Sequence, residues 1–93
     1  PNGKFLWRQA GHFAVRVRAI AGADESSRIE SAFRLAFARK PSAEEVTLSR
    51  ELLHEQAKRY REQKTIPDEQ SADAALVDLC QMLLNTNEFL YIE

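Results

Sequence analysis

Apolar residues recur along this chain at the three- and four-residue spacings of amphipathic helices, and no stretch of any length alternates as a strand would. The pattern predicts four helices, over about residues 5–21, 25–39, 43–63 and 72–86. Short connections favour sequential helices that pack roughly antiparallel. We therefore expect an all-α fold, a compact bundle of about four helices with an extended C-terminal tail, in which residues 1–93 form a single helical domain.

The first and second helices each have an apolar face at helical spacing. The large apolar residues that fall near one face of the first helix are Phe5, Leu6, Phe13, Val17 and Ile20. Gly11 lies inside this helix and either allows a close helix contact or marks a later start, and Gly22 is a stop signal. The second helix is predicted to begin after the N-cap Asp24 and to end before Pro41. Its apolar stripe is Ile29, Ala32, Phe33, Ala36 and Phe37.

The third helix has the clearest start signal, and the fourth has the densest apolar pattern. Ser42 and Glu45 match a capping box, which predicts a helix that begins there. A polar linker over 65–70 precedes the fourth helix, for which Asp68 or Ser71 is the expected cap. Apolar residues cover more than one face of the fourth helix, so we expect it to be the most buried.

The chain beyond Thr86 is expected to leave the helix. Asn85 and Asn87 favour helix exit, because their side chains compete for nearby backbone groups. The apolar residues 89–92 are too few for a helix of their own, so we expect them to lie extended against the bundle.

The net charge of −1 hides an asymmetry between the two halves of the chain. Residues 1–40 carry eight Lys or Arg and three Asp or Glu, whereas residues 41–93 carry five and eleven. We favour the interpretation that the halves pack together with complementary charge. The alternative is a nucleic-acid surface, which is disfavoured because its arginines are spread along two helices without an aromatic stacking pattern. Those arginines are Arg8, Arg16, Arg18, Arg28, Arg34 and Arg39.

The reactive residue types do not form a recognisable catalytic or metal-binding pattern. His12, His54 and Cys80, the candidate metal ligands, fall on three different predicted helices. Cys80 lies amid apolar residues, which favours an inert buried thiol over a nucleophile. The three glycines are scattered, so no phosphate-binding loop is present, and no apolar run approaches the roughly 20 residues that span a bilayer. We assign no catalytic, metal or cofactor residues to this domain.

Two polar segments remain as candidate sites. One is the corner between the second and third predicted helices, where Arg39 is available to pair with a carboxylate. The other is the end of the fourth helix, where an Asn can hydrogen-bond exposed backbone and Glu88 can meet an arginine of the second helix. In both segments a structural clasp is favoured over a ligand site. The candidate residues are Arg34, Arg39, Glu45, Asn85, Asn87 and Glu88.

Residues 28–45 and 75–91 resemble the C-terminal end of a domain of unknown function from planctomycetes and related bacteria. The ending LCQMLLNTNEFLYIE is the most specific part of the resemblance. That domain occurs in large secreted proteins, often beside a second uncharacterised domain and a cytochrome-c-type domain. The family has no established activity, so no catalytic residue carries over, and any haem would belong to another domain of the parent protein.

The resemblance implies an extracytoplasmic location, periplasmic or secreted, for a multidomain parent protein. Because the chain starts at Pro1 rather than Met, we expect a fragment or a processed piece, the C-terminal module of that parent. The leading functional hypothesis is a structural or interaction module, whose partner is the remainder of the parent polypeptide or another protein. Such a module should expose an apolar patch.

Two alternatives remain open at this point. The domain could contribute polar residues to an active site in a secreted hydrolase or redox protein. The residues concerned would be Arg39, Glu45, Asn85, Asn87 and Glu88. Nucleic-acid binding through the basic N-terminal half is the second alternative and the one that we favour least.

Overall fold

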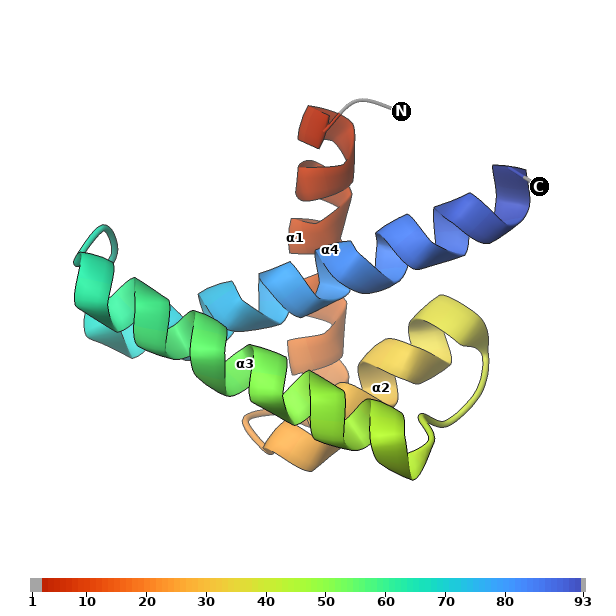
Figure 1. Ribbon diagram of the computed structural model, residues 1–93, viewed down its shortest axis with the longest axis horizontal. Coiled ribbons are helices and arrows are strands. Elements are labelled where there is room, and N and C mark those ends of the chain that lie inside the picture. The colour runs from red at the N-terminus through yellow and green to blue at the C-terminus, as the bar shows by residue number, and fades with distance from the viewer. Residues whose placement is uncertain (1–2, 93) are drawn as a thin grey trace.

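Four α-helices make up the fold, and within residues 3–92 there is no strand (Figure 1). The protein is seen in a computed structural model, which describes the backbone of residues 3–92 and the side chains of residues 7–86. A short 3-10 turn, η1, precedes the last helix. The elements are α1 (Gly3–Ala21), α2 (Glu25–Phe37), α3 (Ala43–Gln63), η1 (Asp68–Gln70) and α4 (Ser71–Ile92). The predicted all-α bundle of four helices is confirmed.

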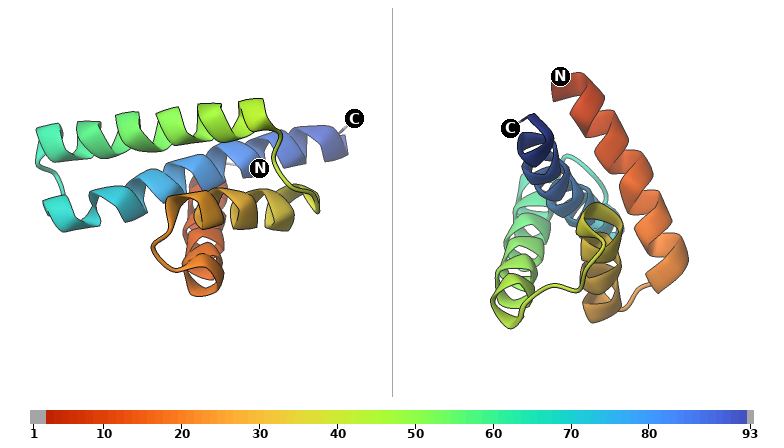
Figure 2. Two further views of the ribbon diagram at one scale, coloured as in Figure 1. Left: turned by 90° about the horizontal axis from the view of Figure 1, so that it is seen from below. Right: turned by 90° about the vertical axis from the view of Figure 1, so that its right-hand side faces the viewer.

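The axes of α2, α3 and α4 are roughly aligned, while the axis of α1 lies across them (Figure 2). α3 runs antiparallel to α2 and to α4, as expected for helices joined by short connections. The expectation is wrong for α1 and α2, which cross. Gly22 ends α1 with φ +67°, a left-handed conformation, and its N–H donates to the Arg18 carbonyl at 2.8 Å. The turn that follows redirects the chain within a few residues.

The face that α1 turns to the core is made of small residues. Ala10, Ala14 and Val17 are fully buried. Phe13 is only partly buried and Ile20 is 63% exposed, so the expected face of large side chains is wrong in part. The side chains of residues 5 and 6 lie outside the described part. A helix that crosses its neighbour touches it over a short patch, and small residues there let the two backbones approach closely.

α4 packs against each of the other three helices. It therefore lies at the centre of the bundle, and its buried residues are Ala75, Leu76, Leu79, Cys80 and Leu83. The predicted stripe of α2 is confirmed for Ile29, Ala32, Phe33 and Ala36, whereas Phe37 is half-buried. α3 adds Leu53 and Ala57 to the core.

The helix starts follow their sequence signals more closely than the ends do. Asp24 caps α2 as predicted, because its carboxylate accepts a hydrogen bond from the Ser27 N–H at 2.9 Å. α2 ends at Phe37, two residues before the expected position, since Ala38 adopts a left-handed conformation with φ 57°. Its N–H donates to the Arg34 carbonyl at 2.9 Å.

The start of α4 differs from the expected capping. Asp68 accepts hydrogen bonds from Lys64 Nζ at 3.0 and 3.1 Å instead of capping the helix. Ser71 is buried, and its hydroxyl has no hydrogen-bond partner within the part of the chain that the structure describes. The turn η1 leads directly into α4, so that the chain enters the helix without a side-chain cap.

The backbone of α4 stays helical as far as Ile92, whereas we expected the helix to end near Thr86 and the tail to lie extended. No Gly or Pro occurs between Ser71 and Ile92, and a single Asn costs only a few tenths of a kcal/mol in a helix. Thr86 Oγ1 donates to the Met82 carbonyl at 3.0 Å, which satisfies its hydroxyl within the helix. The contacts expected of residues 87–93 lie outside the described side chains.

Gly11 and Gly22 give a matched test of α1. Gly11 lies inside α1, and a Cβ added to it would meet nothing within 4 Å, so neither close packing nor a later helix start explains this residue. We expect Gly11→Ala to raise the free energy of unfolding by about 1 kcal/mol through helix propensity. We expect Gly22→Ala to lower it by about 1 kcal/mol, because alanine is strained in the left-handed region.

Urea unfolding followed by circular dichroism measures both changes. A stabilising effect of Gly22→Ala, or a loss of stability on Gly11→Ala, would contradict this account of α1.

Candidate functional site

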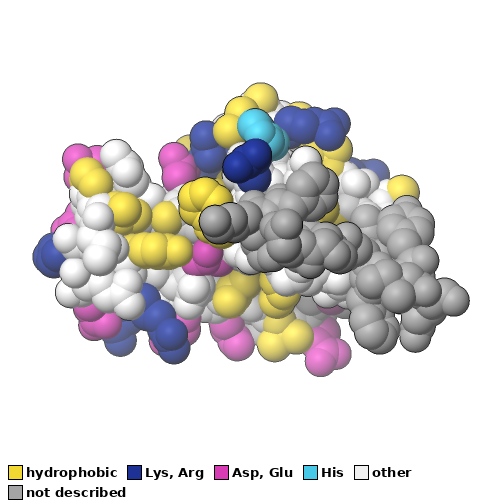
Figure 3. Space-filling model, turned by 90° about the horizontal axis from the view of Figure 1, so that it is seen from above, with side chains coloured by type: hydrophobic (Ala, Val, Ile, Leu, Met, Phe, Trp, Pro, Cys, Tyr) yellow, Lys and Arg dark blue, Asp and Glu magenta, His cyan; other side chains and the backbone are white. Residues whose placement is uncertain are grey.

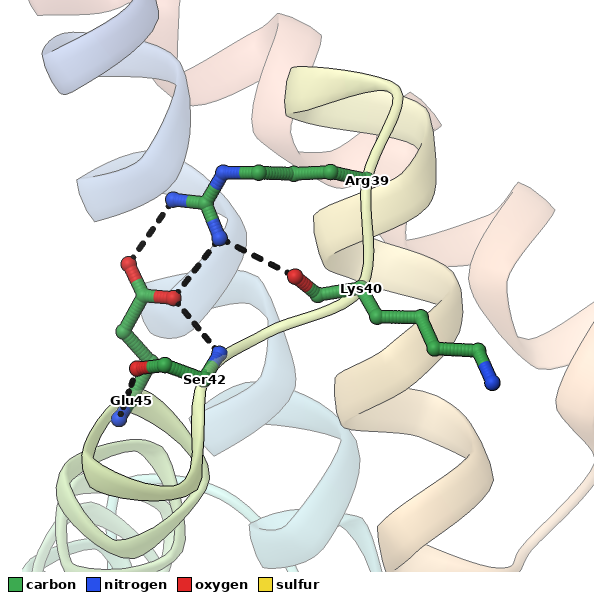
Figure 4. Close-up of polar contacts among 4 residues, drawn as sticks. All are labelled: Arg39, Lys40, Ser42 and Glu45. Atoms are coloured by element: carbon green, nitrogen blue, oxygen red, sulfur yellow. Dashed lines mark hydrogen bonds and ion pairs between the residues drawn. The ribbon is translucent and has the colours of Figure 1, made fainter.

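The corner between α2 and α3 is organised by a two-pronged ion pair (Figure 4). Arg39 Nη1 donates to Glu45 Oε1 at 2.8 Å, and Nη2 donates to Oε2 at 2.9 Å. Arg39 Nη1 also donates to the Lys40 carbonyl at 3.0 Å. The parallel pair of hydrogen bonds is the strongest arrangement that a guanidinium and a carboxylate form. Arg39 thereby fastens the end of α2 to the start of α3.

The predicted capping box shares the same carboxylate. The Ser42 N–H donates to Glu45 Oε1 at 2.8 Å, and the Glu45 N–H donates to Ser42 Oγ at 3.1 Å. The hydrogen bonds from Arg39, followed by the one from the Ser42 backbone, lower the pKa of Glu45 to about 2. Glu45 therefore stays ionised in the folded protein down to strongly acidic pH.

Two aromatic rings of α2 lie beneath the arginine. Phe33 and Phe37, one helical turn apart, have ring centroids 5.7 Å apart and tilted planes. Arg39 Cζ lies 5.8 Å from the centroid of Phe33 and 5.4 Å from that of Phe37, within reach of cation–π attraction. The left-handed Ala38 turns the chain at the end of α2, directly before Arg39.

A cleft of about 790 Å³ opens beside this corner, between α2, α3 and α4. Its floor includes the buried Phe33 and Leu83. Leu48 from α3 and Met82 from α4 also line it, and they are 56% and 44% exposed. Arg39 and Glu45 form part of its wall. The cleft is thus mainly apolar, and its charged groups are already paired with each other.

Arg34 and Asn85, the other predicted site residues whose side chains the structure describes, are not brought to the Arg39–Glu45 pair. Arg34 contacts Glu30, one turn away on α2, at 3.4 Å. Asn85 is exposed and lines a separate hollow between α3 and α4, lined also by Leu52 and Gln56. The side chains of Asn87 and Glu88 lie outside the described residues, and with them the expected contact between Glu88 and Arg34 or Arg39.

A polar cluster between α3 and α4 was missed by the sequence analysis. Gln56 Nε2 and the Tyr60 hydroxyl donate to Asp78 Oδ2 at 2.8 and 2.9 Å. Burial, together with the hydrogen bond to Asp78, raises the pKa of Tyr60 to about 12. Asp78 is the only carboxylate in an apolar stretch of α4, and a partly buried carboxylate requires hydrogen-bond donors. This position in the sequence therefore indicated that a neighbouring helix would supply such donors. Its satisfied hydrogen bonds make it a structural tie.

Two of the reactive candidates, His54 and Cys80, are held in structural roles. His54 Nε2 lies 2.8 Å from Glu25 Oε2 on α2. Burial raises the pKa of the Cys80 thiol to about 12, so that the thiolate is scarce at neutral pH. Among the described residues, no three His, Cys, Asp or Glu side chains gather as metal ligands would. In the same part of the chain, no helix is both long and apolar enough to cross a membrane.

Charges of the two halves do pair between helices. Asp73 of α4 accepts a hydrogen bond from Arg28 Nη1 at 3.1 Å and lies 3.9 Å from Arg18 Nε. In another pair the acidic residue comes from the N-terminal half: Glu25 contacts Arg50 of the C-terminal half at 3.1 Å. Complementary packing thus pairs several of the N-terminal arginines with carboxylates. These pairs neutralise only part of the excess positive charge of residues 1–40.

Comparison of the chain with family models, with curated proteins and with solved structures finds no match.

The pairing of Glu45 predicts a pH-dependent stability. The pKa of Glu45 is lower in the folded than in the unfolded state. The contribution of ionised Glu45 to the free energy of unfolding is therefore complete above about pH 4.5 and is lost as the pH falls towards 2. Because the pair is partly open to solvent, we expect Glu45→Gln to cost only about 1 kcal/mol at pH 7. Urea unfolding at several pH values should show the two proteins converging in acid.

The matched control is Glu44→Gln, in the same first turn, which should have a much smaller effect that arises only from the helix dipole. A pH-independent difference for Glu45→Gln would rule out the ion pair as its source.

Cys80 gives a second test of the arrangement. Because the thiol is fully buried and its pKa is raised, we expect it to react with a thiol reagent at pH 8 far more slowly than in unfolded protein. The rate should rise with denaturant in parallel with unfolding. Fast modification of the native protein would mean that α4 is not covered as described.

Proposed function

We propose that this domain is a structural and interaction module that docks a larger protein through the apolar cleft between α2, α3 and α4. The observation that carries the proposal is the exposure of Leu48 and Met82, two large apolar side chains that line one cleft with a buried aromatic floor. The partner is an apolar segment, either of the remainder of a parent polypeptide or of another protein.

The energetics favour coverage of this cleft. Burying a Leu or Met side chain contributes about 1.5–3 kcal/mol, so the exposed fractions of Leu48 and Met82 represent unused stabilisation. Exposed apolar surface that is rimmed by polar groups marks interaction sites. The Arg39–Glu45 pair supplies such a rim and holds one wall in place, so that a partner meets a preformed surface.

We further propose that the parent is an extracytoplasmic multidomain protein of a planctomycete-like bacterium, with this domain as its C-terminal module. The support is the sequence resemblance of residues 28–45 and 75–91. In that setting a haem would belong to a different domain of the parent.

The two alternative functions receive less support from the geometry. A contribution to an active site needs polar groups that are available to a substrate, but Arg39 and Glu45 satisfy each other. Nucleic-acid binding along α1 and α2 needs free arginines on both helices, and Arg28 and Arg34 are engaged with carboxylates.

Site-specific photo-crosslinking in the full-length gene product, in its own cells, tests the proposal. A photoreactive residue at position 48 should form a discrete crosslink, which mass spectrometry can map to an apolar segment. The same residue at the exposed position 58, farther along α3, should not form that crosslink. Met82→Glu, which places a charge elsewhere on the cleft lining, should abolish the crosslink from position 48.

Thermal unfolding of Met82→Glu provides the control, because a half-exposed side chain should tolerate the change with little loss of stability. No crosslink from position 48, or equal crosslinks from both positions, would refute the docking role of the cleft.

A further inference from the structure

The outer face of α1 carries a stripe of cationic residues. Arg8, His12 and Arg16 are spaced four residues apart, so they share one face of the helix, and all three are exposed. We call these three residues the α1 stripe; it extends for about 12 Å along the helix axis. Figure 3 shows Lys and Arg side chains and a histidine gathered over α1, with hydrophobic side chains beside them.

Among the side chains that the structure describes, no carboxylate neutralises the positive charge of the α1 stripe. α1 contains no Asp or Glu. The other arginines of the N-terminal half contact carboxylates, as Arg18 and Arg28 do with Asp73. Within the described side chains, residues 7–86, neither Arg8 nor Arg16 has a carboxylate within ion-pair distance. Arg8 and Arg16 therefore carry part of the basic excess of the first half on this face.

Exposed apolar side chains border the α1 stripe along one margin and at its C-terminal end. Trp7 and Val15, eight residues apart, lie along one margin and are 62% and 53% exposed. Ile20, four residues beyond Arg16, lies at the C-terminal end of the stripe and is 63% exposed. Tryptophan and arginine are the residue types that most often anchor protein–protein interfaces. A surface that mixes them on one rigid helix has the composition of a binding site rather than of a solvated face.

We propose that the α1 stripe binds an acidic, partly apolar helix of a protein partner. On such a helix, carboxylates one turn apart repeat at about 6 Å, the same interval that separates Arg8, His12 and Arg16. Two arginines then meet two carboxylates, while apolar residues of the partner cover Trp7 and Val15. α1 does not contribute to the lining of the cleft, so the proposal is independent of the docking role of the cleft.

The same observations disfavour the other anionic surfaces. Nucleic-acid affinity comes from many phosphate contacts, and two permanent charges over about 12 Å provide few. The exposed glutamates of α3, among them Glu51 and Glu55, would oppose a polyanion that wraps the domain. A membrane-surface helix keeps its apolar residues on the face opposite its charges, whereas here Trp7 and Val15 lie beside the charges and Ile20 continues their line.

Trp7 is the only tryptophan of the chain, so its fluorescence reports directly on this face. The probe is a synthetic helical peptide of about 20 residues, with glutamates at every fourth position and leucines along the next edge. Titration of the peptide should shift the Trp7 emission. The double variant Arg8→Ala/Arg16→Ala should weaken binding by about tenfold or more, as should replacement of the peptide glutamates by glutamine.

The matched control is Arg59→Ala/Arg61→Ala, which removes two exposed arginines of α3 and should leave the affinity within about twofold. Circular dichroism verifies that every variant is folded. The proposal is overturned if the acidic peptide does not bind at low salt, or if both double variants weaken binding equally. Tighter binding to a DNA duplex or to phosphatidylserine vesicles than to the peptide would also overturn it.

Discussion

The apolar side chains of α4 point to several sides of the helix, and burying them all requires a neighbouring helix on each of those sides. The positions of α1, α2 and α3 follow from this requirement. Leu76, Leu79 and Leu83 are almost fully buried, and α4 packs against α1, α2 and α3. α1 covers it by crossing with Ala10 and Ala14, because a crossing helix gains most from side chains that allow a close backbone approach. A domain of this size has little stability to spare, so each of these contacts matters.

The corner after α2 shows how a strained residue is maintained by its surroundings. Ala38 in the left-handed region costs about 1 kcal/mol or more. The hydrogen bonds between Arg39 and Glu45, together with the cation–π contact with Phe37, offset this cost, since they require the chain to turn there. The same turn sets one wall of the apolar cleft. Structural stability and the proposed docking surface therefore depend on one set of contacts.

The charge asymmetry of the sequence has two consequences in the fold. Part of it is used between helices, where Asp73 accepts a hydrogen bond from Arg28 of α2 and lies near Arg18 of α1. The remainder stays on the surface, where Arg8 and Arg16 lie on α1. The domain therefore presents two surfaces of different chemistry, an apolar cleft between α2, α3 and α4 and a cationic stripe on α1.

The sequence by itself determined the four helices, the caps at Asp24 and Ser42, and the burial of α4, because these depend on spacing and on contacts within a few residues. It also indicated that Arg39 would find a carboxylate. Only the tertiary structure decided which face of α1 is buried, where α2 ends, and that Leu48 and Met82 line one cleft. The physical reason is that the buried face of α1 and the cleft depend on how helices far apart in the chain pack, which leaves no periodic mark in either helix alone. The end of α2 depends on the contacts of the corner, where Ala38 turns the chain and Arg39 meets Glu45.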